Sequence, residues 1–502
     1  MPRLLKRECV LSERGIVFAA YGQQSHHHLN VWQRKGRTMT HDRIQDWIGM
    51  WRVPVYTAAV ALYMVAQFVE TAPVHYAMGA AALSAFIVSA FFARGVYQVS
   101  GALFFAFGVG LFLFYGDAWP TFVLHFERVL GLLALFFVLP FMNTLIRVGR
   151  YDQSLSEWLK RNVGGVSSLY RRSFSVCHLL GLFLNIATIP LLVKSLRTAL
   201  RNVGGRKAES FYVRNLLRAY ALCLTWSPME VMISTTIDFT GVHYYEVALF
   251  LLLLAFTMAM IDWGTAAVSY RSIPLDNGEE AGRESAVSIG KKAAQLLVVL
   301  VVFTVLVSLV QRWLGKGFLF SIVLLLVPFC FGWALLVRRV KRYAVMALCH
   351  WKERTEGLGN YFFMFLGAGL FVEMLARSPL LAGLGGWFRV GAEHSVWLYA
   401  MIAAYFFTTS LVGFHPLVSL TLLMPLLEPV RLLVPAVPLS IVLICCSLAT
   451  VMYSPYNISV SLLAEELGDN PYRIGRRNVP FALGYMAVGI GIALLAERLF
   501  FG

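Results

Sequence analysis

Apolar segments long enough to cross a bilayer alternate with polar segments along almost the whole chain. A membrane-spanning helix needs about 20 consecutive apolar residues. The first half offers such segments near residues 53–71, 74–92, 97–115, 129–148, 174–196, 219–237 and 245–263. The second half offers them near residues 293–313, 317–337, 361–389, 395–427, 437–466 and 478–498. The pattern predicts an all-α, polytopic integral membrane protein with about 10–12 spans.

Polar segments divide the chain into four parts. Residues 1–52 form a polar, basic tail, and residues 271–292 form a polar linker. The first transmembrane repeat is therefore expected at 53–270 and the second at 293–502. No apolar core follows the first basic cluster of the tail, so no cleavable signal peptide is expected. A further basic segment, 338–354, is expected to be a loop.

Two Ser-Pro sites interrupt apolar segments in a common register. Ser227-Pro228 lies within 219–237, and Ser454-Pro455 lies within 437–466. At the same spacing, three further residues after each site are identical: Ser234 and Ser461, Gly241 and Gly468, and Tyr245 and Tyr472. An internal repeat is the best single explanation of these five identities.

Proline inside an apolar segment predicts a broken helix. It lacks the backbone N–H and clashes with the preceding turn. In lipid each freed backbone group needs a partner, so breaks are tolerated where protein or a water-filled cavity surrounds them. Broken helices at corresponding places in two halves indicate a transporter binding site. Two ordinary proline kinks are the simpler alternative.

Two other interrupted stretches, 129–148 and 361–389, are candidate re-entrant hairpins. The sequence leaves open whether each one turns back or crosses the bilayer. If both behave alike, an odd number of crossings separates the two Ser-Pro sites. The two repeats are then inverted relative to each other, as alternating access through related halves suggests.

Charge and composition fix the environment. The chain of 502 residues is 58% hydrophobic and 14% charged, which excludes soluble globular classes. Its net charge of +16 comes from Lys and Arg clustered between apolar segments, which is the positive-inside pattern and not a nucleic-acid surface. We expect a cell-membrane protein with a cytoplasmic N-terminus, although the basic segment 147–172 conflicts with this orientation.

Polar residues at the two breaks are the first candidates for binding a substrate or a coupling ion. Asn457, Ser454 and Ser227 either bind a solute or cap the half-helices. The N-terminus of a half-helix carries partial positive charge, which favours an anionic group. Glu230 occupies the position of Asn457 in the repeat. A carboxyl group at membrane depth either carries a proton or pairs with a cation, and an arginine near a basic loop is the structural alternative.

Five further polar residues lie in apolar segments. His415 sits in a Gly-x-His-Pro break, where it either titrates near neutral pH or bonds to a carbonyl. Glu373 is a second candidate proton carrier unless it reaches the interface. The remaining three are candidate ligands or helix–helix hydrogen-bonding groups: Asn143, Asn185 and Thr188.

The succession of scaffold spans, candidate hairpins and broken helices resembles the ion transporter superfamily, which includes divalent anion/sodium symporters and the large subunits of tripartite carboxylate transporters. Residues 447–457 are similar to the Ser-Leu-Ala…Thr-Pro-Pro-Asn tip of the dicarboxylate symporters, and each half carries Pro-Leu-Leu, at 190–192 and 425–427. The family's Ser-Asn-Thr signature is missing, because its positions read Leu-Gly-Leu at 180–182 and His-Pro-Leu at 415–417. The resemblance implies the architecture and leaves the substrate undefined.

These features predict a secondary active transporter of a small, anionic solute that works by alternating access. We expect coupling to Na⁺ or H⁺, no catalytic residues, and no resident metal or cofactor. The expected partners are the lipid bilayer and the solute, and a homodimer is one option for assembly. Two alternatives stay open: a membrane-embedded glycan polymerase or ligase, and a non-transporting membrane subunit of a larger permease.

Overall fold

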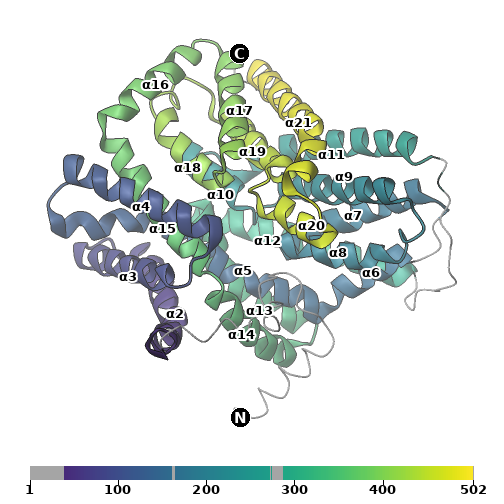
Figure 1. The fold of residues 1–502 in the computed structure, drawn as a ribbon, viewed down its shortest axis with the longest axis horizontal. Helices are drawn as coiled ribbons and strands as arrows, with labels where there is room; N and C mark the ends of the chain where they lie inside the picture. The colour runs from purple at the N-terminus through teal and green to yellow at the C-terminus, as the bar shows by residue number, and fades with distance from the viewer. Residues whose placement is uncertain (1–38, 161–163, 272, 274–285, 501–502) are drawn as a thin grey trace. The chain divides into compact units, whose positions relative to one another are not determined.

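The computed structural model describes residues 39–160, 164–271, 273 and 286–500 (Figure 1). Every regular element within these ranges is a helix. Twelve stretches of the described chain are long and apolar enough to cross a membrane. The all-α, polytopic architecture expected from the apolar pattern is therefore confirmed. Most of the expected tail and linker lies outside the described residues, and the described end of the tail, from Met39 on, is already helical.

The chain folds into two compact units, and each takes segments from both halves of the sequence. Unit 1 comprises Met1–Leu145 and Val323–Leu381, as far as these are described. Unit 2 comprises Ile146–Ile322 and Ala382–Gly502, again within the described residues. The repeats expected at 53–270 and 293–502 are a different division of the chain, based on sequence similarity, and they stay a prediction.

Unit 1 is built around a close pair of helices. Its elements are α2 (Met39–Ala66), α3 (Ala72–Ala90), α4 (Gly95–Tyr115), η1 (Trp119–Val129), most of α5 (Leu130–Gly149), most of α13 (Phe318–Leu336), α14 (Val340–Glu356), α15 (Gly359–Arg377) and the start of α16 (Pro379–Gly391). Helices α4 and α15 pack along each other. A Cβ atom on Gly367 would lie 2.7 Å from the carbonyl oxygen of Gly101. Small residues allow this approach, which is a common way for membrane helices to associate.

Unit 2 contains the two broken helices. Its elements are α6 (Tyr151–Lys160), α7 (Val166–Leu184), η2 (Asn185–Ala187), α8 (Thr188–Arg197), α9 (Gly205–Leu224), α10 (Val231–Thr240), α11 (Tyr244–Ser269), α12 (Ala286–Leu314), α17 (Ser395–Val412), α18 (Pro416–Leu427), α19 (Ala436–Tyr453), α20 (Ile458–Leu467) and α21 (Pro471–Phe500). Helix α19 is buried along nearly its whole length, whereas α11 and α12 expose many apolar side chains, as expected of lipid-facing helices.

The two candidate hairpins differ from each other in the structure. Residues 130–149 form one continuous helix, α5, so this stretch does not turn back. The hydroxyl of Thr144 donates to the carbonyl of Pro140 at 2.8 Å, an ordinary i−4 side-chain bond within the helix. The stretch 361–389 instead divides at Ser378, which is extended and separates α15 from α16. Because both stretches also contain a candidate membrane span, Trp119–Gly149 and Gly359–Arg377, the inverted relation of the two repeats stays a prediction.

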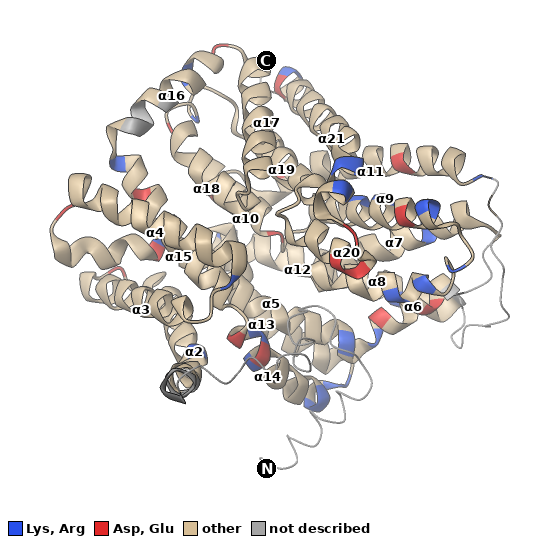
Figure 2. Cartoon of the chain, viewed as in Figure 1, with Lys and Arg blue, Asp and Glu red and all other residues tan. Residues whose placement is uncertain are grey.

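The segment 338–354, expected to be a basic loop, is helical instead, because α14 spans Val340–Glu356. Tyr343 and Ala347 are buried one helical turn apart, and the charged residues of α14 lie on its other faces. Figure 2 shows both signs of charge on this helix. The high charge of this segment led to the prediction of a loop. Its short apolar stripe nevertheless packs against the rest of unit 1 as one face of a helix.

The expected breaks are present, and they agree in one register. Helices α10 and α20 each have 10 residues, begin after Glu230 and Asn457, and end at Gly241 and Gly468. Both glycines adopt left-handed backbone angles, with φ of 75° and 66°. Such angles suit glycine and stop a helix without steric cost. The similarity of the two sequences therefore extends to the start and the end of each half-helix.

Contacts between the half-helices and the rest of unit 2 are reciprocal. Helix α10 packs against α18 and α19, and α20 packs against α8 and α9. Each half-helix thus contacts the two elements that precede the other half-helix in the chain. The hydroxyl of Ser440 on α19 donates to that of Thr240 at the end of α10, at 2.8 Å. Through these contacts the two halves of the sequence pack against each other within one compact unit.

Gly475 provides a test of packing beside the second break. A Cβ atom there would lie 2.0 Å from the carbonyl oxygen of Tyr453, the last residue of α19. We expect Gly475→Ala to lower the unfolding free energy by about 1–3 kcal/mol, because the two helices must move apart. Gly484 on the same helix has open space around it, so Gly484→Ala is the matched control. Thermal unfolding of both variants in detergent should show a fall in Tm for Gly475→Ala alone.

Candidate substrate site at the helix breaks

The first break spans residues 225–230, between α9 and α10. The amide of Ser227 donates to the carbonyl of Leu224 at 3.2 Å, and the amide of Glu230 donates to that of Ser227 at 3.0 Å. Pro228 has no N–H to continue the helix. The backbone therefore makes a tight turn, and α10 restarts at Val231 with the Glu230 side chain at its N-cap. The Oγ atom of Ser227 has no hydrogen-bond partner among the described residues.

The second break spans residues 454–457, between α19 and α20. The amide of Asn457 donates to the carbonyl of Ser454 at 3.0 Å, which repeats the turn of the first break. Ser454 differs from its counterpart Ser227, because its hydroxyl donates to the carbonyl of Ser410 on α17 at 2.8 Å. The second turn is therefore fixed to a neighbouring helix, whereas Ser227 keeps a hydroxyl available to a ligand.

Glu230 is a buried carboxylate without a cationic partner. Its Oε1 atom accepts one long hydrogen bond, 3.5 Å from the amide of Met232. No lysine or arginine of the described chain forms an ion pair with it. The structural alternative, a nearby arginine, is therefore not observed within the described residues. An ionised carboxylate at membrane depth is costly unless a cation or a proton neutralises it.

Asn457 caps α20 and keeps one polar group in reserve. Its Oδ1 atom accepts from the amide of Ser459 at 3.1 Å and from the hydroxyl of the same residue at 2.8 Å. Because a backbone amide can only donate, the atom that faces it must be the oxygen, and the Nδ2 group points the other way. No described residue accepts a hydrogen bond from Nδ2. The residue thus combines capping, the structural alternative considered above, with a donor that could serve a ligand.

His415 caps a third helix start. Its Nδ1 atom accepts from the amide of Leu417 at 3.3 Å, so this nitrogen carries no proton in the structure. Gly413, two residues earlier, has a φ of 114° and ends α17. A Cβ atom on Gly413 would lie 3.5 Å from the ring of Tyr456 in the second break. The expected break at 413–416 is therefore confirmed, and it lies beside the break at 454–457.

A fourth break occurs at Asn185, where the sequence indicated polar groups but not a break. Asn185 has a φ of 51° and a ψ of −136°, a positive-φ conformation that residues with a side chain rarely adopt. Its Oδ1 atom accepts from the hydroxyl of Tyr220 on α9. Thr188 follows at the start of α8, and its buried hydroxyl has no hydrogen-bond partner within the described protein. Unit 2 therefore holds both Asn185 and Thr188.

Two of the nine sequence candidates lie in unit 1 instead. Asn143 is on α5. Glu373 is on α15, where its carboxylate pairs with Arg128 at 2.8 Å and with Arg377 at 3.4 Å. These two arginines supply the charge compensation that Glu230 lacks. The geometry favours an ion pair as the role of Glu373, and the structure places the other seven candidates together in unit 2.

Beside the second break lies a buried ionic network that the sequence did not predict. Arg218 on α9 donates to Asp262 on α11 at 2.7 Å and to Asn478 on α21 at 2.9 Å. Tyr170 on α7 donates to the other carboxylate oxygen of Asp262 at 2.8 Å. Asn478 in turn donates to the carbonyl of Met452, two residues before the break. All these side chains are buried, and the network joins five helices of unit 2.

His178 and three buried hydroxyl groups are further polar groups that the sequence did not single out. The indole N–H of Trp226, in the first break, donates to Nε2 of His178 on α7 at 2.9 Å. The hydroxyls of Thr235, Thr236 and Ser419 have no hydrogen-bond partner within the described protein. Buried polar groups are normally paired, so unpaired ones mark places where a ligand or water could bind. Their only sequence signal was a polar residue within an apolar segment.

Comparisons with known proteins bear on the fold. No protein-family model matches the chain, and no curated protein matches it. Among solved structures, the chain is similar to the crystal structure of the YdaH transporter of Alcanivorax borkumensis, which is described as having an unusual topology. The two are 12% identical, the TM-score is 0.51, and the match covers 80% of this chain and 99% of the other. At this identity the likeness shows the fold alone, so the chain shares its fold with a transporter.

This solved structure is not one of the divalent anion/sodium symporters that residues 447–457 resemble. The likeness therefore supports the broader expectation of a multi-pass membrane protein with a transporter's fold. The narrower resemblance to that group, including its substrate class, is carried forward only as part of the proposal below.

Proposed function

We propose that the protein is a secondary active transporter of a small, anionic solute, coupled to Na⁺ or H⁺. The observation that carries the proposal is the matched pair of half-helices in unit 2. They share a register and have equivalent N-caps, but one cap is the carboxylate of Glu230 and the other is the neutral amide of Asn457. Broken helices in corresponding positions are the arrangement on which secondary transporters build their sites.

The difference between the two caps assigns a role to each end. At the start of α20, Nδ2 of Asn457 and the positive end of the helix both favour an anion. At the start of α10, Glu230 already supplies negative charge, which favours a cation or a proton. We therefore place the solute at Asn457 and the coupling ion at Glu230. The reciprocal packing of α10 and α20 supports a pseudo-two-fold relation, and inverted repeats would produce it.

We place the protein in the plasma membrane, with its N-terminus in the cytoplasm, because the distribution of Lys and Arg favours that orientation. The resemblance to divalent anion/sodium symporters supports a carboxylate or inorganic anion as the first class of solute to examine.

A panel of solutes tests the function directly. Purified full-length protein is heated with small mono- and dicarboxylates and inorganic anions, each in Na⁺ and in K⁺ and at two pH values. A bound ligand raises Tm by mass action, so a hundredfold excess over Kd corresponds to about 2.7 kcal/mol of stabilisation. We expect an anion to stabilise the protein, and to do so in an Na⁺- or pH-dependent way. Turnover of lipid-linked sugars with no anion effect would instead identify a glycan-processing enzyme.

Two substitutions of Asn457 separate binding from capping. We expect Asn457→Ala to abolish uptake of the solute and to cost about 1 kcal/mol, because both the cap and the Nδ2 donor are lost. Asn457→Asp keeps the cap but replaces the donor with negative charge, so its stability should be retained while uptake is still lost. Proteoliposome uptake and thermal unfolding measure the two effects. Normal uptake by Asn457→Asp would show that the residue is only a cap.

A further inference from the structure

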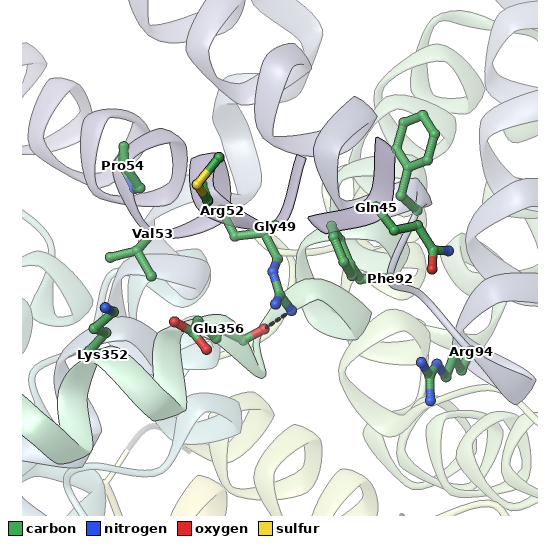
Figure 3. A pocket seen from close by; sticks show the side chains of 11 residues that line it. Gln45, Gly49, Arg52, Val53, Pro54, Phe92, Arg94, Lys352 and Glu356 are labelled. Atoms are coloured by element: carbon green, nitrogen blue, oxygen red, sulfur yellow. Dashed lines mark hydrogen bonds between the residues drawn. The ribbon is translucent and has the colours of Figure 1, made fainter. Parts of the chain in front are cut away.

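A cavity of about 650 Å³ in unit 1 has no role in the proposed transport site. It lies where residues 45–54 of α2, the loop after α3 and the end of α14 meet (Figure 3). None of its lining residues belongs to unit 2, which holds the helix breaks.

Positive charge dominates the lining of this cavity. Arg52, Arg94 and Lys352 line it, and Glu356 is the one acidic residue in the lining. Neither Arg94 nor Lys352 forms an ion pair with any described residue. Both side chains are exposed, so these cations line the open side of the cavity without a paired carboxylate. A phosphate group, with two or more negative oxygens, matches such a set of donors.

Arg52 is held in place at the wall of the cavity. Its Nη1 atom donates to the backbone carbonyl of Glu356 at 3.1 Å, as the dashed line in Figure 3 shows. The guanidinium carbon lies 4.0 Å above the ring of Phe92. Its Nε atom is buried and has no hydrogen-bond partner within the described protein. The guanidinium is thus oriented by two contacts while one donor stays unused, which is the state of a preorganised anion-binding side chain.

The cavity lies beside the ends of three candidate membrane spans, the start of the α2 span, the end of the α3 span and the start of the α4 span. The apolar span of α2 begins at Trp47, and Arg52 is only a few residues further on. Trp47 and Trp51 are 60% and 50% exposed, on the same helix as the cavity lining. Tryptophan side chains gather at the headgroup level of bilayers. Basic pockets between membrane helices at this level are places where lipid headgroups bind.

We propose that the cavity formed by α2, the α3–α4 loop and α14 binds a phosphate group, carried by an anionic lipid headgroup or by a small soluble anion. Arg52 and Phe92 form the fixed wall, while Arg94 and Lys352 supply the remaining charge. The exposed tryptophans favour the lipid as the source. This site is independent of the proposed transport site, since it shares no residue with it.

Native mass spectrometry of the purified full chain tests the site. The probes are phosphatidylglycerol, zwitterionic phosphatidylcholine, glycerol phosphate and inorganic phosphate, all at one ionic strength. We expect phosphatidylglycerol to bind more tightly than phosphatidylcholine. Arg94→Gln and Lys352→Gln should each weaken its binding about fivefold, since a cation near an anionic membrane surface contributes about that much. The double variant should weaken it roughly 25-fold if the two effects add.

Two matched variants complete the design. Lys341→Gln removes the same charge from an exposed position on α14 that does not line the cavity, so lipid affinity should stay unchanged. Glu356→Gln removes the acidic group and leaves the backbone carbonyl that holds Arg52, so affinity should rise. Tight binding of the soluble phosphates alone, with the same dependence on Arg94 and Lys352, would assign the site to a free anion. The proposal would be overturned if Lys341→Gln lowered lipid affinity as much as Arg94→Gln and Lys352→Gln do, or if none of the probes bound.

Discussion

We expect Glu230→Gln to reduce solute uptake to background while the protein still inserts and folds. The reason lies in the contacts of this side chain, which is buried and has no cationic partner among the described residues. Glutamine has nearly the same shape, and its carbonyl oxygen can still accept from the amide of Met232, as Glu230 does at 3.5 Å. The cap of α10 is therefore preserved. What is lost is the charge that, in our proposal, holds the coupling proton or Na⁺.

The measurement is uptake into proteoliposomes of the anion found in the solute panel, driven by an Na⁺ or a proton gradient. Glu393→Gln is the control, because it makes the same chemical change at an exposed position of unit 2. A second readout needs no solute: the difference in Tm between Na⁺ and K⁺, or between two pH values, should shrink in Glu230→Gln. Uptake and ion dependence at the level of Glu393→Gln would remove Glu230 from the mechanism.

The largest effect on stability is expected at Arg218. Arg218→Met leaves the fully buried carboxylate of Asp262 with Tyr170 as its only remaining partner in the network, and it deprives Asn478 of a donor. Breaking a buried ion pair by removing one partner costs about 3–5 kcal/mol, because the other charge is left uncompensated. The loss should appear as a large fall in Tm. The network also holds the carbonyl of Met452 just before the second break, so we expect anion binding to weaken as well.

The double variant Arg218→Met/Asp262→Asn separates charge from packing. It removes both charges, so it should recover a large part of the stability lost in the single variant. Arg473→Met is the control, because this arginine is 63% exposed and pairs with Asp469 in the connection just before α21. Exposed ion pairs contribute about 0.2–1 kcal/mol. A single variant as stable as Arg473→Met would show that the buried pair adds little.

The break positions were predictable because they depend on local chemistry. Pro228, Pro455 and Pro416 lack the N–H that a helix needs, and Gly241 and Gly468 accept left-handed angles. These constraints act within a few residues, so they can be read from sequence. The break at Asn185 was missed because the nearest proline, Pro190, is five residues later, and an asparagine with a positive φ gives a weaker signal.

The partners of the polar residues could not be predicted. Arg218 and Asn478 are 260 residues apart in the chain, and Glu373 and Arg128 come from different helices of unit 1. Glu230 and Glu373 looked alike in the sequence, as single carboxylates within apolar segments. The fold gave two arginines to Glu373 and none of the described ones to Glu230. The same long-range contacts made α14 a helix where its charge had indicated a loop.

By itself, the sequence determined that this chain is a helical membrane protein with many spans, and that two of its helices are interrupted at corresponding positions. Hydrophobic run length and proline chemistry are enough for both, since each acts over one helix or less. Only the tertiary structure decided which interruptions share a compact unit, which acidic side chain stays uncompensated, and where a basic cavity forms. Those outcomes depend on contacts between segments far apart in the chain, and apolar packing in a membrane leaves little trace of them in the order of residues.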